Sequence, residues 1–278
     1  MRYFFLFLSV FFISCKQENP FFAAARQNDH KKLPSRGGDW LLSHPEKFVS
    51  YEDFIEKYKP IDSTTAQVIC IQPVGFSQVH FNPDFQKCAT YLSLFFQKNV
   101  RINNSQILVP NSQNSRTGYD LELQLNAKFI NDTLLTQSPF TNYIATMALT
   151  ENDIYPGNDW IYVFGLANYA NRVGITSTYR FKSEDPKVAF SRLIKVASHE
   201  TAHMFGLTHC VRNECLMNGC NHIVELDRNS LRLCSLCQQK LAYRLRINPE
   251  KRSLDLQKFF IENNFPEVAK LLAKDCGL

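Results

Sequence analysis

The sequence predicts an α/β fold built on a mixed, twisted sheet. Short runs of β-branched and other apolar residues, of which residues 66–73 are the clearest, have the composition of buried strands. They alternate with stretches such as 82–97, where apolar residues recur at helical spacing. Strands that alternate with helices in this way are typical of a sheet covered by helices.

The expected elements begin near residue 39. Strands are expected at residues 66–73, 100–109, 143–150, 160–167 and 173–181, and helices at 44–59, 82–97, 121–135, 187–207 and 253–273. Residues 111–118 have the composition of a loop. Asp185 and Pro186 precede the helix expected at 187–207. An acidic residue and a proline are both favoured at a helix N-terminus, so these two residues support a helix start here. Pro266 marks a turn that would divide the last stretch into a helical hairpin.

The charge and its distribution argue against a nucleic-acid partner. The 278 residues carry a formal net charge of +5, and the lysines and arginines are scattered along the chain. Basic residues are densest within 240–252, where they alternate with apolar residues, as expected for a solvated helix face rather than a binding patch. These basic residues are Lys240, Arg244, Arg246, Lys251 and Arg252.

The N-terminal residues predict export. Arg2 is followed by an almost unbroken apolar run over residues 3–13, which is too short to span a bilayer but matches an export signal. Ser14 and Cys15 follow this run. A small residue before a cysteine resembles the lipobox of bacterial lipoproteins, although Phe12 stands where leucine is usual.

Cleavage before Cys15 would leave a lipid-anchored chain. We expect residues 1–14 to be the signal peptide and residues 15–38, which are mostly polar and lack sustained periodicity, to be a tether. Plain secretion and an uncleaved anchor are the alternatives. All three place residues 39–278 outside the cytoplasm, either on a membrane of a bacterial cell envelope or as a secreted or periplasmic protein.

The run from His199 to His209 carries the strongest functional signal. His199 and His203 are four residues apart, so on a helix their side chains lie on one face and can bind one cation. Glu200 is next to the first of them, near a metal but not on it, as a general base requires. Gly206 lets the chain leave the helix through a backbone conformation that is costly for other residues, and the turn can return His209 as a third ligand.

This ligand set predicts a catalytic zinc site. Three neutral imidazoles leave one position of a tetrahedral zinc ion open for water, which distinguishes a catalytic site from a structural one. Zinc lowers the pKa of bound water to about 7, and Glu200 can accept the proton as hydroxide attacks a peptide carbonyl. A bare H-E-x-x-H arises by chance in many chains, but the added Gly206 and His209 leave far fewer accidental matches.

The pattern H-E-x-x-H-x-x-G-x-x-H resembles that of the metzincins, and the residues after it resemble the archaemetzincin (archaelysin) family. Cys210 and Cys215 are followed by Met217, and a C-x-x-C pair at Cys234 and Cys237 ends the pattern. The stretch between Met217 and Cys234 is one residue shorter than is usual in the family. Weaker similarity covers about residues 38–245, through Gly38-Asp39-Trp40-Leu41, Gln72-Pro73, Asp153-Ile154-Tyr155-Pro156 and Val163-Phe164-Gly165.

The resemblance implies a metzincin-like (zincin) fold, in which the sheet lies above an active-site helix and Met217 lies in a Met-turn beneath the metal. It also implies a Cys-rich C-terminal subdomain, followed by helices from about residue 246 to 278. A second, structural zinc would be bound there by Cys210, Cys215, Cys234 and Cys237. Four thiolates in two close pairs suit such a closed tetrahedral site.

Disulfides are the alternative for these cysteines, because an exported chain meets oxidising conditions. Cys220 lies nearby, and the sequence does not decide the pairing. Cys70 and Cys88 lie on elements that could be neighbours, where two buried free thiols and a bridge fit equally well. His222 is expected at the surface rather than in the metal cleft. Residues 218–220 include no tyrosine, so the transition-state tyrosine that many metzincins have there cannot be assigned.

Together these patterns predict an exported zinc metallopeptidase that acts on peptides or proteins. One catalytic and one structural Zn²⁺ are its expected cofactors, and a lipid at Cys15 its expected contact with a membrane. An aminopeptidase-like preference for short substrates stays open, since no residue indicates it. The alternative is a catalytically silent, zinc-stabilised surface lipoprotein that binds a peptide or protein partner. Glu200 argues against it, because a structural metal site does not need a base.

Overall fold

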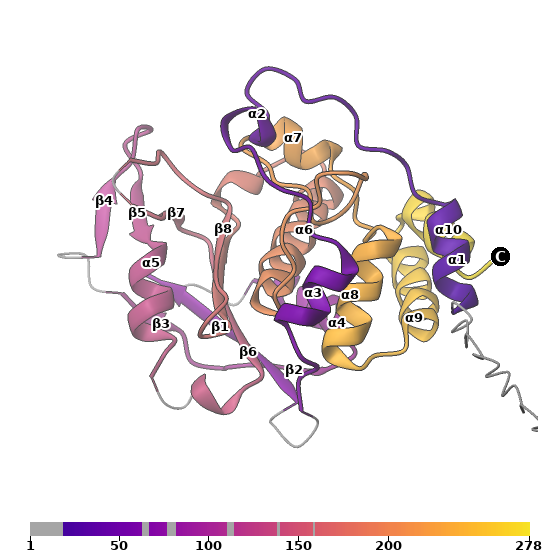
Figure 1. The fold of residues 1–278 in the computed structure, drawn as a ribbon. Coiled ribbons are helices and arrows are strands. Elements are labelled where there is room, and N and C mark those ends of the chain that lie inside the picture. Colours follow the sequence, from indigo (N-terminus) through magenta and orange to yellow (C-terminus); the bar gives the residue numbers. More distant parts are fainter. Residues whose placement is uncertain (1–18, 63–66, 77–81, 110–113, 138–139, 158) are drawn as a thin grey trace, which may run out of the picture.

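The structure, a computed structural model, describes residues 19–278 except 63–66, 77–81, 110–113, 138–139 and 158. The expected signal peptide and Cys15 lie outside the described residues. A mixed sheet forms one side of the molecule, and helix α6 (Pro186–Met204) lies between this sheet and the C-terminal helices (Figure 1). No helix in the described part of the chain is long and apolar enough to cross a bilayer.

The main sheet contains six strands within the described residues, in the order β2-β1-β6-β9-β8 with β3 paired to the end of β1. Strand β8 runs antiparallel to β9 and the other pairs are parallel, so the sheet is mixed, as predicted. These strands are β1 (Val68–Gly75), β2 (Asn99–Ile102), β3 (Ile107–Leu108), β6 (Ala145–Thr150), β8 (Gly165–Asn168) and β9 (Val173–Ser177). A smaller sheet, in the order β4-β5-β7, consists of β4 (Ser115–Thr117), β5 (Leu123–Asn126) and β7 (Asp153–Tyr155).

The helices begin where the sequence supplies an N-cap and a proline. Helices α4, α6 and α9 each have proline in the first turn, and each follows an Asn or Asp whose side chain accepts a backbone N–H of that turn. Besides α6, the α-helices of the described chain are α1 (Pro20–Gln27), α2 (Trp40–Ser43), α3 (Tyr51–Lys57), α4 (Pro83–Phe96), α5 (Ala127–Phe129), α7 (Ile223–Arg228), α8 (Ser235–Leu245), α9 (Pro249–Glu262) and α10 (Pro266–Asp275).

Side chains that alternate along β6 divide the core into two layers. Met147 and Leu149 belong to the larger layer, which includes the buried residues of α4, α6 and α9. Ala148, between them, belongs to the smaller layer on the opposite face, with Ile130 and Ile175. Both faces of this central strand are therefore buried, as is usual for a parallel strand with helices on either side. The larger layer fixes α6 against β8 and β9, next to the edge of the sheet.

Most predicted elements are confirmed, but the strand predicted at 160–167 begins only at residue 165, and the helix predicted at 121–135 is wrong for its first half. Residues Leu123–Asn126 form strand β5, which pairs with β7. Only then does the chain turn into α5 and a single π-helical turn, Ile130–Leu134. The apolar residues Leu123 and Leu125 are spaced by two, which is the period of a strand, and the buried amide of Gln124 between them donates to Asp153 at 2.7 Å.

The tether predicted at residues 15–38 is also wrong over its described part. Residues Pro20–Gln27 form helix α1, which buries Phe21 and Ala25 and packs against α8 and α10. Asp29, just after this helix, accepts hydrogen bonds from the buried guanidinium of Arg232 at 2.9 Å and from the Ser235 hydroxyl at 2.6 Å. A helix needs only a few apolar residues on one face to pack against other helices. A mostly polar stretch can therefore still form a packed helix.

Two local predictions need smaller corrections. The amphipathic helix predicted at 44–59 is shorter, because Ser50 starts α3 as a capping box with Asp53. The basic residues within 240–252 do not all lie on a solvated face. Lys240 and Arg252 are buried, and they donate hydrogen bonds to the backbone carbonyls of Val49 and Phe95. Long basic side chains can be buried when backbone acceptors satisfy their N–H groups.

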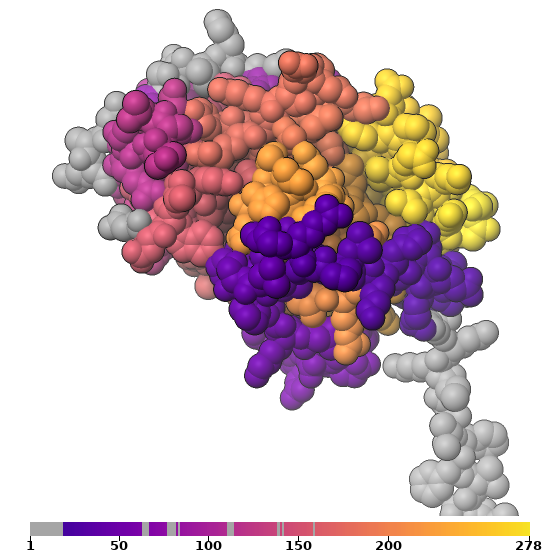
Figure 2. All heavy atoms as spheres, turned by 90° about the horizontal axis from the view of Figure 1, so that it is seen from above, coloured from indigo at the N-terminus to yellow at the C-terminus, as the bar shows by residue number. Residues whose placement is uncertain are grey.

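Between α1 and α3 the chain forms a strap, residues 29–50, that crosses the surface of residues 210–237, the Cys-rich segment. Figure 2 shows it as the indigo segment laid over the orange residues. Lys31 forms a bridge with Asn213, and the N–H of Lys32 donates to the carbonyl of Arg212 at 2.8 Å. Further along, α2 lies beside α7 at the top of the view in Figure 1. The strap thus brings residues near the N-terminus to the segment that follows the histidine motif.

Candidate metal centre

Helix α6 carries three residues of the motif, and the turn after it returns the fourth. The Asp185 side chain accepts the N–H of Lys187 at 2.8 Å and so caps the helix start. The helix ends at Met204, and Gly206 has a φ of +95°, a value that glycine adopts without steric cost. A Cβ on Gly206 would also lie only 3.0 Å from the ring of Tyr58.

The two helical imidazoles present lone pairs to one another. The Nδ1 atom of His199 lies 2.9 Å from the carbonyl oxygen of Leu216, and that of His203 lies 2.6 Å from the carbonyl oxygen of Leu207. A carbonyl can only accept, so each Nδ1 carries a proton and each neutral ring has its lone pair on Nε2. These two Nε2 atoms are 2.9 Å apart.

The third imidazole has a different partner, which the sequence did not reveal. The Nδ1 atom of His209 lies 2.6 Å from Oε1 of Glu46, a residue of the strap. A carboxylate acceptor fixes the proton on Nδ1 and again leaves Nε2 as the lone pair. Burial would raise the pKa of Glu46, but hydrogen bonding and charge attraction from His209 outweigh it and lower that pKa. No spacing in the sequence connects Glu46 with a histidine 163 residues away.

The donor set fits zinc. One nitrogen from each of His199, His203 and His209 lies within 4.8 Å of the others. Nitrogens bound to one zinc at 2.0–2.1 Å would be separated by about 3.3 Å at tetrahedral angles. Burial, followed by repulsion from the neighbouring imidazoles, lowers the pKa of His203 to about 3 and that of His199 well below its usual value. Two neutral nitrogens that face each other without a proton repel, so a shared cation would stabilise this arrangement.

Glu200 lies beside the three imidazoles and inside the protein. Its side chain is nearly fully buried, and this burial raises its pKa to about 8. The space that it occupies depends on Gly165 in the edge strand β8. A Cβ on Gly165 would lie 2.6 Å from Cγ of Glu200, which is closer than such atoms approach. Glycine at the edge of the sheet is therefore what allows the carboxylate to face the cleft.

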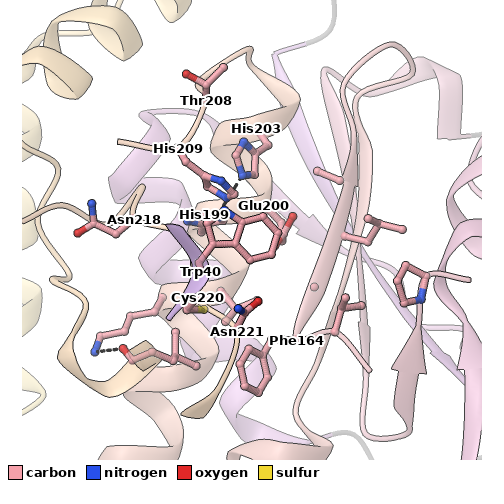
Figure 3. A pocket seen from close by; sticks show the side chains of 18 of the residues that line it. Trp40, Phe164, His199, Glu200, His203, Thr208, His209, Asn218, Cys220 and Asn221 are labelled. Atoms are coloured by element: carbon pink, nitrogen blue, oxygen red, sulfur yellow. Dashed lines mark hydrogen bonds between the residues drawn. The ribbon is translucent and has the colours of Figure 1, made fainter. Parts of the chain in front are cut away.

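An open cleft of about 790 Å³ gives access to these residues. Its walls come from β8 and the loop before it, from α6 and from the segment after the histidine motif. Figure 3 shows the indole of Trp40 next to His199 and His209. The ring centroids of Trp40 and His209 are 5.1 Å apart, in an edge contact. Trp40 was assigned no role from the sequence, because only the fold brings it here.

The four predicted thiol ligands also converge. The sulfur atoms of Cys210, Cys215, Cys234 and Cys237 lie within 4.8 Å of one another, and all four residues are buried and free of disulfides. The Sγ atoms of Cys210 and Cys234 are 3.8 Å apart. A disulfide would require about 2.05 Å, whereas thiolates on one zinc at 2.3 Å would be separated by about 3.8 Å. The Cys215 sulfur accepts the backbone N–H of Cys234, as sulfur ligands of a metal commonly do.

The loop that carries Met217 connects the two clusters. The carbonyl of Leu216, between Cys215 and Met217, is the acceptor that fixes the His199 ring. The Met217 carbonyl accepts the N–H of Cys210 at 2.7 Å, and the Met217 side chain is fully buried. The Asn218 amide closes the same loop by donating to the Cys210 carbonyl at 2.6 Å. A displacement of Cys215 would therefore move the neighbouring Leu216 carbonyl, which fixes the His199 ring.

A further group of possible metal ligands, Asp39, His222 and Glu225, is occupied by hydrogen bonds. Arg228 donates to Asp39 at 2.6 Å, which puts a positive charge where a cation would bind. His222 Nδ1 accepts the N–H of Glu225 and so caps α7, while the Glu225 carboxylate accepts the N–H of Trp40. His222 is partly exposed and outside the metal cleft. This group fastens the strap rather than binding a metal.

The other cysteines that the sequence left open are free thiols. Cys70 and Cys88 are both buried without a bridge between them. Burial raises the pKa of the Cys70 thiol to about 12 and that of Cys88 further, so both stay protonated at neutral pH. Cys220 is half-buried in the wall of the cleft and stays outside the group of four thiols.

Comparison with known proteins gives the same assignment. The family model described as "Peptidase family M54" matches residues 108–243. Archaemetzincin-2 of rat is 26% identical over 82% of this chain and 74% of the relative, and that of human is 28% identical over 73% and 66%. The crystal structure of archaemetzincin from Methanopyrus kandleri covers 65% of this chain and 96% of its own, with 26% identity and a TM-score of 0.54. Residues 108–243 of the chain therefore match peptidase family M54, and the chain is similar to the archaemetzincins, which supports a zinc metallopeptidase.

Proposed function

We propose that the protein hydrolyses peptide bonds, with His199, His203 and His209 as the ligands of a catalytic zinc and Glu200 as the general base. One observation carries this proposal: three imidazole lone pairs converge beside a buried carboxylate at the wall of an open cleft. Three neutral ligands leave a position for water, which a closed structural site does not.

A bound zinc ion would supply a water of lowered pKa and polarise the scissile carbonyl. Glu200 would accept a proton from the attacking water as the water oxygen bonds to the carbonyl carbon. The same carboxyl group then donates the proton to the amide nitrogen as the C–N bond breaks, so the base is regenerated. Burial raises the pKa of Glu200 in the metal-free protein, and a bound cation would lower it again, which would leave the carboxylate able to accept a proton.

The edge strand β8 is suited to bind the peptide. The Phe164 carbonyl, just before β8, accepts the N–H of Ser177, so alternate residues bond to β9. The backbone groups of Gly165 and Ala167 consequently point away from β9, and both residues line the cleft. An extended peptide can add to such an edge through main-chain hydrogen bonds. This arrangement would place a peptide carbonyl beside Glu200.

We further propose that Cys210, Cys215, Cys234 and Cys237 bind a structural zinc, and that Met217 forms the floor of the catalytic site as a Met-turn. The sulfur separation and the buried loop around Met217 support this. Zinc content per chain tests it. Two zinc ions, of which one is removed by a mild chelator, are expected; one zinc and oxidised cysteines would contradict the structural site.

The location of the protein is proposed from the sequence motif alone. Cys15 would be acylated after removal of residues 1–14, and the enzyme would lie outside the cytoplasm on a membrane. Incorporation of a labelled fatty acid into the full chain, and its loss in Cys15→Ser, would support the anchor. Release of an unlabelled chain into the medium would favour plain secretion instead.

The experiment that tests the catalytic proposal replaces Glu200 with glutamine. The wild-type protein should cleave a mixture of short peptides with free and blocked N-termini, and a preference for free N-termini would identify an aminopeptidase. Glu200→Gln should retain both zinc ions and lose about 10²–10⁴-fold in kcat, the usual contribution of a general base.

Two outcomes would count against this proposal. Equal turnover by wild-type protein and Glu200→Gln would show that Glu200 is not the base. Full zinc occupancy of both forms, with cleavage of no peptide by either, would favour the silent binding protein.

A further inference from the structure

We propose that Glu46, which the strap brings to the metal centre, is a positioning residue that orients His209 and strengthens it as a zinc ligand. This inference rests on the proposed function, because it assumes that His209 binds zinc. Glu46 lies well before the segment of residues 108–243 that the family model matches. If Glu46 has this role, a complete metal site needs the strap, which lies outside residues 108–243.

The contact between the two side chains is short and directional. Glu46 Oε1 lies 2.6 Å from Nδ1 of His209, and both side chains are mostly shielded from solvent. The same oxygen accepts the indole N–H of Trp40 at 2.5 Å. Two donors on one oxygen fix the direction of the carboxylate, so Glu46 can hold the imidazole plane and not only attract its charge.

His209 is the ligand that most needs such support. His199 and His203 lie on α6, and their Nδ1 protons are donated to the backbone carbonyls of Leu216 and Leu207. His209 lies beyond the helix, on the segment after Gly206, and its Nδ1 partner is a side chain. A carboxylate that accepts the Nδ1 proton fixes the tautomer and raises the basicity of Nε2, which strengthens a bond to a metal.

The strap is held rigidly enough to perform this task. The backbone N–H of Trp40 donates to the buried carboxylate of Glu225 at 3.0 Å, and the Trp40 ring contacts the edge of His209. Gly219 leaves room for this ring, because a Cβ there would lie 2.5 Å from Cδ1 of Trp40. Asp39, next to Trp40, is paired with Arg228 at 2.6 Å. Trp40 and Glu46 are therefore anchored to the loop that follows the zinc ligands.

A purely structural role for Glu46 predicts different behaviour. If the carboxylate only fastens the strap, its removal should lower the melting temperature and leave zinc affinity unchanged once the protein is folded. A positioning role predicts weaker zinc binding at the imidazoles in a protein that remains folded. The thiol site serves as an internal reference, since Glu46 touches none of its four cysteines.

The test compares full-length wild-type protein with Glu46→Gln and Glu46→Ala, and with Glu56→Gln as the matched control. Glu56 is an exposed glutamate on the neighbouring helix α3, away from the metal centre. Zinc affinity is measured by competition with a chelator at a fixed pH, together with zinc content and kcat at saturating zinc. Loss of an outer partner of this kind typically weakens metal binding about 10–100-fold.

We expect this loss at the chelator-sensitive site in Glu46→Ala and a smaller one in the isosteric Glu46→Gln, which keeps an acceptor but not the charge. Glu56→Gln should match the wild type, and the tightly bound zinc should be retained in all four proteins. Unchanged affinity at the chelator-sensitive site in both Glu46 variants would overturn this inference alone. A wild-type protein with no chelator-sensitive zinc would overturn the proposed catalytic site as well.

Discussion

At the metal centre, burial holds ionisable side chains in their neutral forms. Burial raises the pKa of Glu200 to about 8, and burial and mutual repulsion lower the pKa of His203 to about 3. A cation among these side chains would reverse the effect on Glu200 by attracting its negative charge. The same residues should therefore make the metal-free protein sensitive to pH in a way that zinc suppresses.

The pH dependence of stability can be assigned to Glu200 by comparison with Glu200→Gln. The folded pKa of about 8 is above the usual glutamate value of 4.5, so folding favours the protonated carboxyl group. This contribution is complete below pH 4.5 and is lost as pH rises towards 8. In chelator-treated protein, Glu200→Gln should gain stability over the wild type between pH 5 and 8, on the order of a few kcal/mol. Urea denaturation at each pH measures it, and a constant difference would contradict the assignment.

Gly165 should be as important to catalysis as a residue that touches substrate. In Gly165→Ala the new Cβ would displace the Glu200 side chain, which lies 2.6 Å from its position. Misplacement of a catalytic group by about 1 Å can cost ~10²-fold in rate. We expect a fall in kcat of that size with zinc content unchanged. Gly37→Ala, where a Cβ would meet no atom within 4 Å, is the control. Wild-type kcat in Gly165→Ala would rule out this steric role.

At the scale of single elements, α6 and the turn after it form the working unit of the site. The helix sets the spacing of His199 and His203, while the turn decides whether His209 reaches them. Gly206 at φ +95° is the point where the chain changes direction. Helix geometry is robust to most substitutions, but a left-handed turn against an aromatic ring is not, so the third ligand depends on this turn.

Gly206→Ala should disturb both stability and zinc binding. A side chain at positive φ costs about 1–2 kcal/mol, and the Cβ would also meet the Tyr58 ring at 3.0 Å. Gly277→Ala is a matched control, since Gly277 has φ +75° with no atom within 4 Å of the new Cβ. Urea denaturation and chelator competition should show a loss of stability in both variants and weaker zinc binding in Gly206→Ala only. Equal zinc affinity in the two variants would argue against this view of the turn.

At the scale of the whole molecule, helices α1 and α10 both contact the Cys-rich segment. Arg232 is buried between Asp29, after α1, and Asp275, at the end of α10. It also donates to the carbonyl of Ala25. One guanidinium thus joins the N-terminal helix, the segment between the thiol ligands and the C-terminal helix. The strap is held at one end by this network and at the other by α3, which packs on α8.

Loss of Asp275 should destabilise the whole fold. Asp275→Ala removes a carboxylate that lies 2.7 Å from Arg232 and leaves a buried charge with less compensation. Removal of one partner of a buried pair typically costs about 3–5 kcal/mol. Asp255→Ala, which removes only an exposed i,i+4 pair with Lys251, should cost under about 1 kcal/mol. Denaturation in urea compares the two, and equal losses would mean that the Arg232 network contributes little.

Much of the site could be predicted from the sequence because its ligands are close in the chain. His199, Glu200 and His203 need only a helix to be placed, and Gly206 marks where that helix ends. The family resemblance likewise implied that Cys210, Cys215, Cys234 and Cys237 form one site, with disulfides as the alternative, and the structure brings these four thiols together without a disulfide. Local spacing encodes the contacts within one turn of helix α6, which is why His199, Glu200 and His203 could be named from the sequence.

The sequence by itself predicted which histidines and cysteines the structure brings together, the helix that carries His199 and His203, and the mixed α/β class. Only the tertiary structure decided that Glu46 supports His209, that residues 20–29 pack on the fold instead of forming a tether, and that Arg232 and Arg252 are buried. Each of these depends on contacts between residues far apart in the chain. Such contacts are set by the packing of whole elements, so no local pattern of charge or hydrophobicity records them.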